Sequence, residues 1–266
     1  MCLWMGERGG RFIILGEEIL GLLFPPRCPV CDRILELEEI RKGNRIHATC
    51  RKKLYPVIQP FCCHCGRPVA DGEVEYCFDC RKKIRQTESP YWKGKPASFF
   101  LRGRAVFLYR GEIRKTMYRF KYSNRREYAS FLAQEAVSLL GDWIVGCGVE
   151  AVVPVPLYKG KQKRRGYNQA GLFAGKLAKM LRLSYEPAAL VRMRDTTPQK
   201  VLDDKERKNN LKSAFQAADF VVKYKCILLV DDIYTTGSTA EAAAGELYAA
   251  GVKKIYFLAA CIGEGF

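Results

Sequence analysis

The sequence has no apolar run long enough to cross a membrane. The longest apolar stretch near its start, Phe12–Phe24, has thirteen residues and contains Glu17 and Glu18, whereas a membrane-spanning helix needs about 20 largely apolar residues. The stretch also lacks an A-x-A-like cleavage site, so we do not expect a secretory signal peptide. We expect residues 1–25 to form an amphipathic helix that packs on the rest of the protein, and we expect a cytoplasmic location.

Two other features are absent or scarce. No G-x-x-x-x-G-K-[ST] motif occurs in the chain, so a Walker-type nucleotide site is not expected. Asp and Glu number 28 against 45 Lys and Arg, and the formal net charge of +17 favours polyanionic partners. The length of 266 residues allows one sizeable α/β core and a small additional module.

Twelve cysteines are unusual for a reducing cytosol unless they bind metal. Most of them occur in C-x2-C or H-x2-C pairs, and two such pairs close a tetrahedral zinc site. The predicted zinc ligands are Cys28, Cys31, His47, Cys50, Cys62, Cys65, Cys77 and Cys80. A disulfide framework and an iron–sulfur cluster are the alternatives.

The order of the eight ligands predicts two sequential sites most simply, and a cross-braced pairing is the alternative. In a double zinc ribbon, residues 28–50 hold the first ion and residues 62–80 the second; in a cross-braced arrangement, Cys28 and Cys31 join Cys62 and Cys65. Cys63 and His64 lie inside a C-x2-C pair and are expected to be bystanders. Because each site has four protein ligands, we expect both Zn²⁺ ions to be structural.

A second signal lies in the stretch "CILLVDDIYTTGST", Cys226–Thr239. Its continuous apolar start is typical of a strand covered on both faces. The Ala-rich segment after Gly237 favours a helix, and Ser238 and Glu241 have the spacing of a capping box. Two carboxylates and a small-residue loop therefore stand between a buried strand and a helix N-terminus.

This arrangement suits a ligand that carries both ribose and phosphate. A helix N-terminus offers free N–H groups to an anion, and ligands of open α/β sheets bind at the carboxyl ends of strands. Asp231 and Asp232 are good acceptors for sugar hydroxyls and good ligands for Mg²⁺. A magnesium site unrelated to sugars, followed by an ordinary turn, is the alternative.

A basic cluster follows another predicted strand, Ala151–Val155. Lys159, Lys161, Lys163, Arg164 and Arg165 crowd seven positions before a predicted amphipathic helix over 168–181. If these side chains point at the same site as the two aspartates, they would neutralise a pyrophosphate. A nucleic-acid contact is the alternative.

Residues 81–128 hold fifteen Lys and Arg against three Glu, with aromatic residues interleaved. Aromatic side chains beside a basic groove are typical of single-stranded nucleic-acid binding without sequence preference. The candidate contacts are Arg102, Arg104, Arg110, Arg114, Lys115 and Lys121. In the alternative interpretation, Phe99, Phe107 and Phe120 belong to a core and the charges cover a solvated face.

The segment "VRMRDTTPQKVLDDKERKNN" is polar and lies between two strand-forming regions. We expect a flap that closes over the ligand and carries Arg194, Gln199 and Arg207. Closure would exclude water from a reacting ribose carbon. A merely solvated loop is the alternative.

The stretch "LLVDDIYTTGST" resembles the phosphoribosyl-pyrophosphate (PRPP) motif of type I phosphoribosyltransferases. The resemblance implies that Asp231 and Asp232 hold the ribose hydroxyls with Mg²⁺, and that Thr235, Thr236, Gly237, Ser238 and Thr239 cradle the 5-phosphate. It also implies a pyrophosphate loop at Leu157, Tyr158 and Lys159. Relatives that act on 6-oxopurines have a carboxylate where Thr235 stands, so a 6-oxopurine acceptor is not expected.

The order of motifs as a whole resembles the ComF family of competence proteins. The specific pieces are Phe120–Lys121–Tyr122, Arg165–Gly166–Tyr167–Asn168–Gln169, Thr197–Pro198–Gln199 and Arg207-x2-Asn210. The resemblance implies a role in the uptake of single-stranded DNA, beside other DNA-uptake proteins at the inner face of the membrane. It also implies a phosphoribosyltransferase domain, in which Lys159, Arg165 and Arg207 are the candidate catalytic residues.

The predicted fold class is α/β: a parallel sheet flanked by helices, as in type I phosphoribosyltransferases, with a small N-terminal double zinc ribbon. The expected boundaries are 26–85 for the zinc module, 86–110 for a basic bridging segment and 111–266 for the phosphoribosyltransferase domain. Two functional classes stay open. One is an active transferase with an unidentified nitrogen acceptor, and the other is a module that binds PRPP and works by holding DNA.

Overall fold

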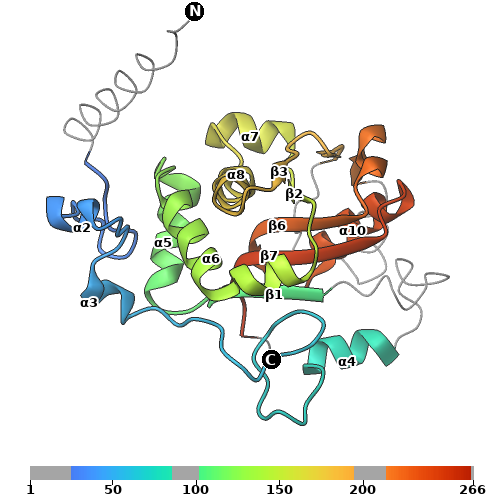
Figure 1. Ribbon diagram of the computed structural model, residues 1–266, viewed down its shortest axis with the longest axis horizontal. Helices are drawn as coiled ribbons and strands as arrows, with labels where there is room; N and C mark the ends of the chain where they lie inside the picture. The colour runs from blue at the N-terminus through green and yellow to red at the C-terminus, as the bar shows by residue number, and fades with distance from the viewer. Residues whose placement is uncertain (1–24, 86–101, 195–213, 265–266) are drawn as a thin grey trace, which may run out of the picture. The chain divides into compact units, whose positions relative to one another are not determined.

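The computed structural model describes residues 25–85, 102–194 and 214–264 (Figure 1). The predicted N-terminal helix, most of the bridging segment and most of the predicted flap lie outside these residues. The chain forms two compact units, Met1–Lys53 and Leu54–Phe266. Within the described ranges, no helix has both the length and the apolar character needed to cross a bilayer.

The described part of the first unit, residues 25–53, holds two short helices, α2 (Leu37–Arg41) and α3 (Ala48–Arg51). A bridge between Arg27 and Ile34 closes a tight turn, in which the Cys28 N–H donates to the Arg33 carbonyl at 2.8 Å. These elements are too small to enclose a large apolar core, so a bound metal is the natural source of their stability.

The second unit is built on a five-stranded sheet in which all neighbouring strands are parallel. The spatial order is β1 (Arg102–Leu108), β7 (Lys254–Ile262), β6 (Cys226–Tyr234), β2 (Ala151–Pro154) and β3 (Ser184–Tyr185). Strands β6 and β2 were predicted at these positions, and the predicted parallel sheet is confirmed. Strand β6 lies in the middle of the sheet, which explains its continuous apolar run.

Helices cover both faces of this sheet. On one face α6 (Tyr128–Gly146) packs against α8 (Gln169–Leu181), and α8 also contacts β6 and β2. On the other face α10 (Ser238–Ala249) contacts β6 and β7. The alternation of side chains along β6 explains this division, because Ile227 and Leu229 share a buried cluster with Leu247 of α10.

Smaller elements complete the second unit. They are α4 (Phe78–Arg85), α5 (Glu112–Tyr122), α7 (Lys159–Arg165), the 3-10 helix η2 (Asp219–Lys223), β4 (Leu190–Arg192) and β5 (Phe215–Ala217). Strands β4 and β5 pair antiparallel, so the start of the predicted flap lies beside residues 215–217. The basic cluster between the predicted strand and the predicted amphipathic helix forms a short helix, α7.

The second set of zinc ligands is part of this unit. Its four cysteines, Cys62, Cys65, Cys77 and Cys80, belong to the same buried cluster as the α10 face of the sheet. The chain also approaches β1 very closely, since a Cβ on Gly66 would stand 2.7 Å from the carbonyl oxygen of Gly103. The two compact units meet between residues 53 and 54, and the first described strand of the sheet begins at Arg102. The domain boundaries at 85 and 110 stay predictions.

Candidate functional site

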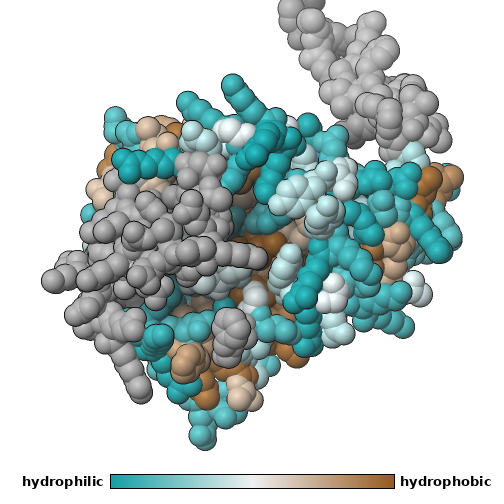
Figure 2. All heavy atoms as spheres, turned by 180° about the vertical axis from the view of Figure 1, so that it is seen from behind, coloured by the Kyte–Doolittle hydropathy of each residue, from teal (hydrophilic) through white to brown (hydrophobic). Residues whose placement is uncertain are grey.

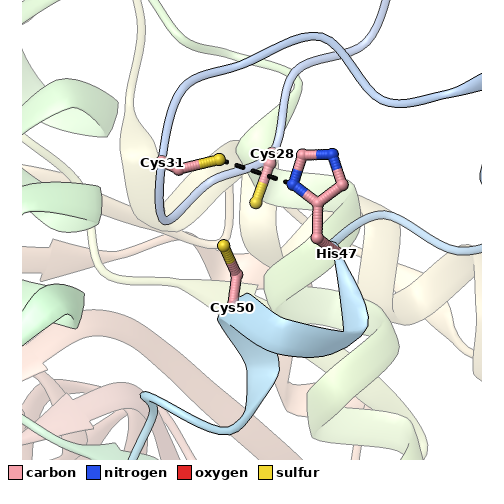
Figure 3. Close-up of side chains that lie close together, drawn as sticks. All are labelled: Cys28, Cys31, His47 and Cys50. Carbon is pink, nitrogen blue, oxygen red and sulfur yellow. Dashed lines mark hydrogen bonds between the residues drawn. The ribbon is translucent and has the colours of Figure 1, made fainter.

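The first predicted ligand set lies together in the first unit (Figure 3). The ligand atoms of Cys28, Cys31, His47 and Cys50 are all within 4.8 Å of one another. The Cys31 sulfur is 3.4 Å from Nδ1 of His47, and Figure 3 shows the three sulfur atoms and this nitrogen around a common centre. This donor set fits a tetrahedral Zn²⁺ ion, with His47 bound through Nδ1.

The second ligand set is fully buried. The sulfur atoms of Cys62, Cys65, Cys77 and Cys80 meet the same 4.8 Å criterion, and those of Cys65 and Cys77 are 3.7 Å apart. A tetrahedral zinc ion with bonds of about 2.3 Å separates its sulfur ligands by about 3.8 Å, so the set fits. The two sets are sequential rather than cross-braced, and the described cysteines are free of disulfides.

The two predicted bystanders lie outside both ligand sets. Cys63 is exposed and His64 is buried. The carbonyl of His64 accepts a hydrogen bond of 2.6 Å from the N–H of Gly103. His64 thus lies where the second zinc ribbon meets β1.

The two aspartates lie at the carboxyl end of β6, the central strand. The N–H of Asp232 donates to Oδ1 of Asp231 at 2.8 Å, and Oδ2 of Asp232 is 3.0 Å from Nζ of Lys121. Lys121 belongs to α5, and only 17% of its side chain is exposed. The sequence predicts a nucleic-acid contact for Lys121, but the structure places this lysine beside the acidic pair.

Burial changes the ionisation of these groups. Burial and the adjacent Asp232 carboxylate raise the pKa of Asp231 to about 7, and Lys121 and Arg192 act in the opposite direction. Burial lowers the pKa of Lys121, but the attraction of the two carboxylates outweighs this effect and the net pKa is raised. The site therefore carries a cation that is firmly protonated at neutral pH beside a carboxyl that titrates there.

The loop predicted to hold a phosphate, residues 235–239, follows directly. Gly237 has the left-handed φ of +82°, and a Cβ at this position would stand 2.1 Å from the hydroxyl of Tyr234. Thr236 and Ser238 share a hydrogen bond of 3.0 Å between their hydroxyls. Thr235 and Thr236 are exposed, so the loop is open to a ligand.

Helix α10 begins at Ser238 as predicted, but the capping box is wrong. The residue before the helix is Gly237, and no side chain caps it. Since Ser238 is already the first helical residue, Glu241 lies one position too far along to complete the box. Its carboxylate instead pairs with Lys83.

The loop after β2 is the second part of the site, because β2 pairs directly with β6. Asn168 fixes this loop by donating from Nδ2 to the Val155 carbonyl at 3.0 Å. Leu157 and Tyr158 are partly buried, and Lys159 is exposed at the first position of α7. The loop and the acidic pair thus lie at the carboxyl ends of two neighbouring strands, β2 and β6.

Arg165 lies at the end of α7 and close to α5. It donates to Oε1 of Gln169 at 3.0 Å and to the Tyr122 hydroxyl at 3.2 Å. Its charge is near enough to Lys121 to act against protonation there. Tyr167 joins the same segments, because its hydroxyl donates to the Phe120 carbonyl. The pieces 120–122 and 165–169 therefore form one structural unit.

Sequence reasoning assigned no role at the acidic pair to Lys121 or Arg192. Both act on the ionisation of Asp231, and Arg192 lies on β4, at the start of the predicted flap. A usable signal existed for Lys121, since Phe120–Lys121–Tyr122 was already identified as a family-like piece. The predicted catalytic Arg207 and the flap residue Gln199 lie outside the described residues, and Arg194 is exposed.

The remaining candidate nucleic-acid residues fall into different environments. Arg102, Arg110, Arg114 and Lys115 are exposed. Arg104 is partly buried between aromatic rings, with its guanidinium 4.0 Å from the Phe61 ring centre. Phe107 and Phe120 are both buried in the core, as expected if these aromatic residues serve packing rather than nucleic-acid binding.

A family model described as "Double zinc ribbon domain" matches residues 19–81. "Competence protein F" of Haemophilus influenzae is 31% identical over 236 residues, which cover 86% of this chain and 93% of that protein. The chain belongs to the competence protein F family. "Competence protein ComFC" of Bacillus subtilis is 29% identical, covering 77% of this chain and 78% of that protein.

Two further comparisons complete the picture of this family member. "DNA utilization protein YhgH" of Escherichia coli K12 is 30% identical, covering 67% of this chain and 73% of that protein. The glutamine PRPP amidotransferase of B. subtilis is a distant structural likeness, with 18% identity and a TM-score of 0.35. That match covers 53% of this chain and only 30% of the amidotransferase. The predicted fold class is confirmed: a parallel sheet flanked by helices follows a double zinc ribbon.

Proposed function

We propose that this family member binds PRPP at the carboxyl ends of β6 and β2 and assists the uptake of single-stranded DNA in natural transformation. One observation carries the first part: a pair of carboxylates and a glycine-dependent loop at a helix N-terminus lie on the strand next to a basic loop. The names of the relatives, which refer to competence and DNA utilization, support the second part.

Each part of the site has a role in this proposal. Asp231 and Asp232 accept hydrogen bonds from the ribose 2- and 3-hydroxyls. The backbone N–H groups and hydroxyls of residues 235–239 hold the 5-phosphate at the N-terminus of α10. Lys159, Arg165 and the loop 157–159 face the pyrophosphate. Mg²⁺ enters with the pyrophosphate, because this ion usually binds through a few carboxylates and the phosphates of a substrate.

Retained transfer chemistry is the second candidate. An active enzyme would stabilise the departing pyrophosphate with Mg²⁺ and the positively charged side chains of α7, while a nitrogen acceptor attacks the ribose carbon. Thr235 supplies no carboxylate to act as a base for the acceptor, which disfavours a 6-oxopurine. An acceptor that is already deprotonated needs no such base. Release of pyrophosphate in the presence of candidate acceptors would separate an enzyme from a binding module.

The first experiment is calorimetric titration of the zinc-loaded full chain with PRPP, with and without Mg²⁺. Asp231→Asn and Asp232→Asn should each weaken binding at least tenfold with zinc content unchanged. Asp142→Asn is the matched control, because Asp142 is an exposed acid on α6. Equal PRPP affinity in the wild type and both site variants would refute the assignment.

A specific surface supports the DNA-handling part of the proposal. On α5 and just before it, Tyr109, Arg114, Lys115 and Tyr118 line a groove of about 440 Å³. Tyr118 and Tyr122 are 62% and 60% exposed, and their ring centres are 5.1 Å apart. We call these five residues the tyrosine face. Exposed rings beside cations are a stacking platform for unpaired bases.

Cations lie next to the rings of this face. The Arg114 guanidinium is 5.6 Å from the Tyr109 ring centre, and the Arg165 guanidinium is 5.0 Å from the Tyr122 ring centre. Arg165 also belongs to the proposed PRPP site, so the tyrosine face and that site are contiguous. Among the described residues visible in Figure 2, most of the surface is hydrophilic, with smaller hydrophobic patches.

Fluorescence anisotropy with a labelled oligothymidine tests this surface. Tyr118→Ala should weaken single-strand binding about tenfold, because stacking on an aromatic side chain contributes about 1–3 kcal/mol per base. Tyr185→Ala is the control: Tyr185 is also partly exposed, but it lies on β3 and bonds the Gly171 carbonyl. Binding that is lost equally in both variants, or in neither, would contradict a role for the tyrosine face.

A further inference from the structure

The second zinc ribbon holds the proposed phosphate loop through a buried arginine. Arg67 follows Cys65 by two positions and is only 5% exposed. Its Nη2 donates to the Thr235 carbonyl at 2.8 Å, and its Nε donates to the Gly263 carbonyl at 2.9 Å. Its third contact is an ion pair with Asp79, which lies between the two cysteines of the second pair of ligands. One side chain thus joins the metal-binding segment to the first residue of the loop.

A lysine makes the next contact along the same loop. Lys83 lies on α4, which also carries Cys80. Its Nζ donates to the Thr236 carbonyl and pairs with the carboxylate of Glu241 on α10. Glu241 is 6% exposed; burial raises the pKa of this carboxyl, and Lys83 counteracts the shift. Lys83 therefore fixes both the loop and the first turn of α10.

These two contacts determine which way the loop amides point. The peptide bonds of the loop are trans, since the single cis bond in the described residues is Gln59–Pro60. In a trans peptide the carbonyl and the following N–H point in opposite directions. Because the carbonyls of Thr235 and Thr236 face Arg67 and Lys83, the N–H groups of Thr236 and Gly237 face away from the zinc ribbon.

The contacts rest on a shared core as well as on polar groups. All four cysteines of the second ligand set belong to one buried cluster with Tyr234 and Ala240, which bracket the loop. Tyr234 lies directly beneath Gly237 and packs on Phe257, with ring centres 5.3 Å apart. The metal-binding segment and the floor of the loop are therefore one packed body.

We propose that the second zinc ribbon is a working part of the anion site, in which Arg67 and Lys83 are positioning residues. They hold the amides of residues 236 and 237 toward the 5-phosphate, and their positive charges polarise the same peptides in the favourable direction. A charged hydrogen bond on a carbonyl strengthens the donor character of the linked N–H. This inference deepens the proposed function and rests on it for the identity of the anion.

The test uses the full chain with both zinc ions and three variants: Lys83→Met, Arg67→Met and Lys82→Met. Lys82 is the matched control, because it is the exposed neighbour of Lys83 on α4. Each variant is first checked for two equivalents of zinc. Hydrogen exchange of the peptide that covers residues 231–241 is then compared with calorimetric titration of PRPP in the presence of Mg²⁺.

In Lys83→Met and Arg67→Met, amide exchange at residues 235–239 should become at least five- to tenfold faster, because local opening is easier. The affinity for PRPP should fall about tenfold in each. Lys82→Met should match the wild type in both measurements. Unchanged exchange in Lys83→Met and Arg67→Met would overturn the inference.

The two readouts separate this inference from the proposed function. If the wild type binds no PRPP, the proposed ligand is wrong, yet the exchange data still decide whether the zinc ribbon holds the loop. If Arg67→Met fails to fold or loses zinc, Lys83→Met decides, because the Lys83 side chain is 28% exposed and its loss leaves no large cavity. Faster exchange with unchanged PRPP affinity would overturn the role of these residues in anion binding.

Discussion

Nζ of Lys121 on α5 lies 3.0 Å from Oδ2 of Asp232 at the end of β6. This ion pair joins two motifs that are far apart in the sequence, and both partners are largely buried. It places a permanent cation beside the carboxylates proposed to hold the ribose. The acidic pair is thereby partly neutralised before an anionic ligand arrives, which lowers the electrostatic cost of bringing phosphates close to it.

Removal of this cation should weaken the site. In Lys121→Met the two carboxylates lose their shared counter-ion, so we expect PRPP affinity to fall about tenfold to a hundredfold and to depend more steeply on Mg²⁺. Titration at several Mg²⁺ concentrations measures both effects. Lys115→Met is the control, because Lys115 is an exposed lysine of the same helix. A Lys121 variant with wild-type affinity at every Mg²⁺ concentration would contradict this role.

The raised pKa of Asp231 predicts how stability changes with pH. The native carboxyl has a pKa of about 7 against an ordinary value of 3.8. The native state therefore binds more protons than the unfolded state between these values, and stability is lost as pH rises through this window. The side chain introduced by Asp231→Asn cannot ionise. The free energy of unfolding of this variant, relative to that of the wild type, should therefore increase by about 2 kcal/mol between pH 5.5 and pH 8.

Thermal unfolding of both proteins at the two pH values measures this difference. Burial is the main cause of the raised pKa; the neighbouring Asp232 carboxylate adds to it, and Lys121 and Arg192 oppose it. Asp142→Asn, on the exposed side of α6, should show no such trend. If the difference in stability between the two proteins stays constant or shrinks as pH rises, the pKa of Asp231 is not raised.

The sequence predicted the parts of the site whose signal is local. Strand β6 and the start of α10 enclose one continuous stretch of sequence, so its pattern alone was sufficient to place them. The assignment of Asp231, Asp232 and Gly237 to a ligand site stays a prediction. The zinc ligands were equally local, because each pair of ligands is separated by only two residues. The predicted sequential pairing of the two sets is confirmed, and the structure excludes the cross-braced alternative that the spacing also allowed.

The contacts that required the fold are those between distant segments. Lys121 reaches Asp232 because α5 and β6 meet in space, and Arg67 reaches Thr235 for the same kind of reason. Both are basic residues in a chain with 45 of them, so composition gave no hint of their separate roles. The predicted capping box is wrong because Gly237, not Ser238, occupies the position just before the helix. The spacing of Ser238 and Glu241 alone could not show this.

The two zinc sites should differ in what depends on them. Cys50→Ser removes a ligand from the first unit, whereas Cys80→Ser removes one that lies in the buried cluster of the sheet. Each variant should lose one equivalent of zinc. Only Cys80→Ser should lower the thermal transition of the sheet and speed hydrogen exchange in β6 and β7, because its metal stabilises that core. Equal effects of the two variants on β6 would contradict this division.

Gly237 offers the sharpest test of the phosphate loop. An alanine there must adopt a φ of +82° and place its Cβ 2.1 Å from the Tyr234 hydroxyl, so either the loop or the buried tyrosine must move. Strain and overpacking each cost about 1–3 kcal/mol, and we expect Gly237→Ala to lose about 2 kcal/mol or more of stability. Its PRPP affinity should fall more than tenfold.

The matched control is Gly146→Ala at the end of α6, where an added Cβ meets nothing within 4 Å. That variant should unfold at or slightly above the wild-type temperature, because alanine is the better helix former. If Gly237→Ala is as stable as the control and also binds PRPP with wild-type affinity, the loop does not need a glycine with left-handed φ at position 237. The 5-phosphate would then have to be held by other groups, and the assignment of residues 235–239 would fall with it.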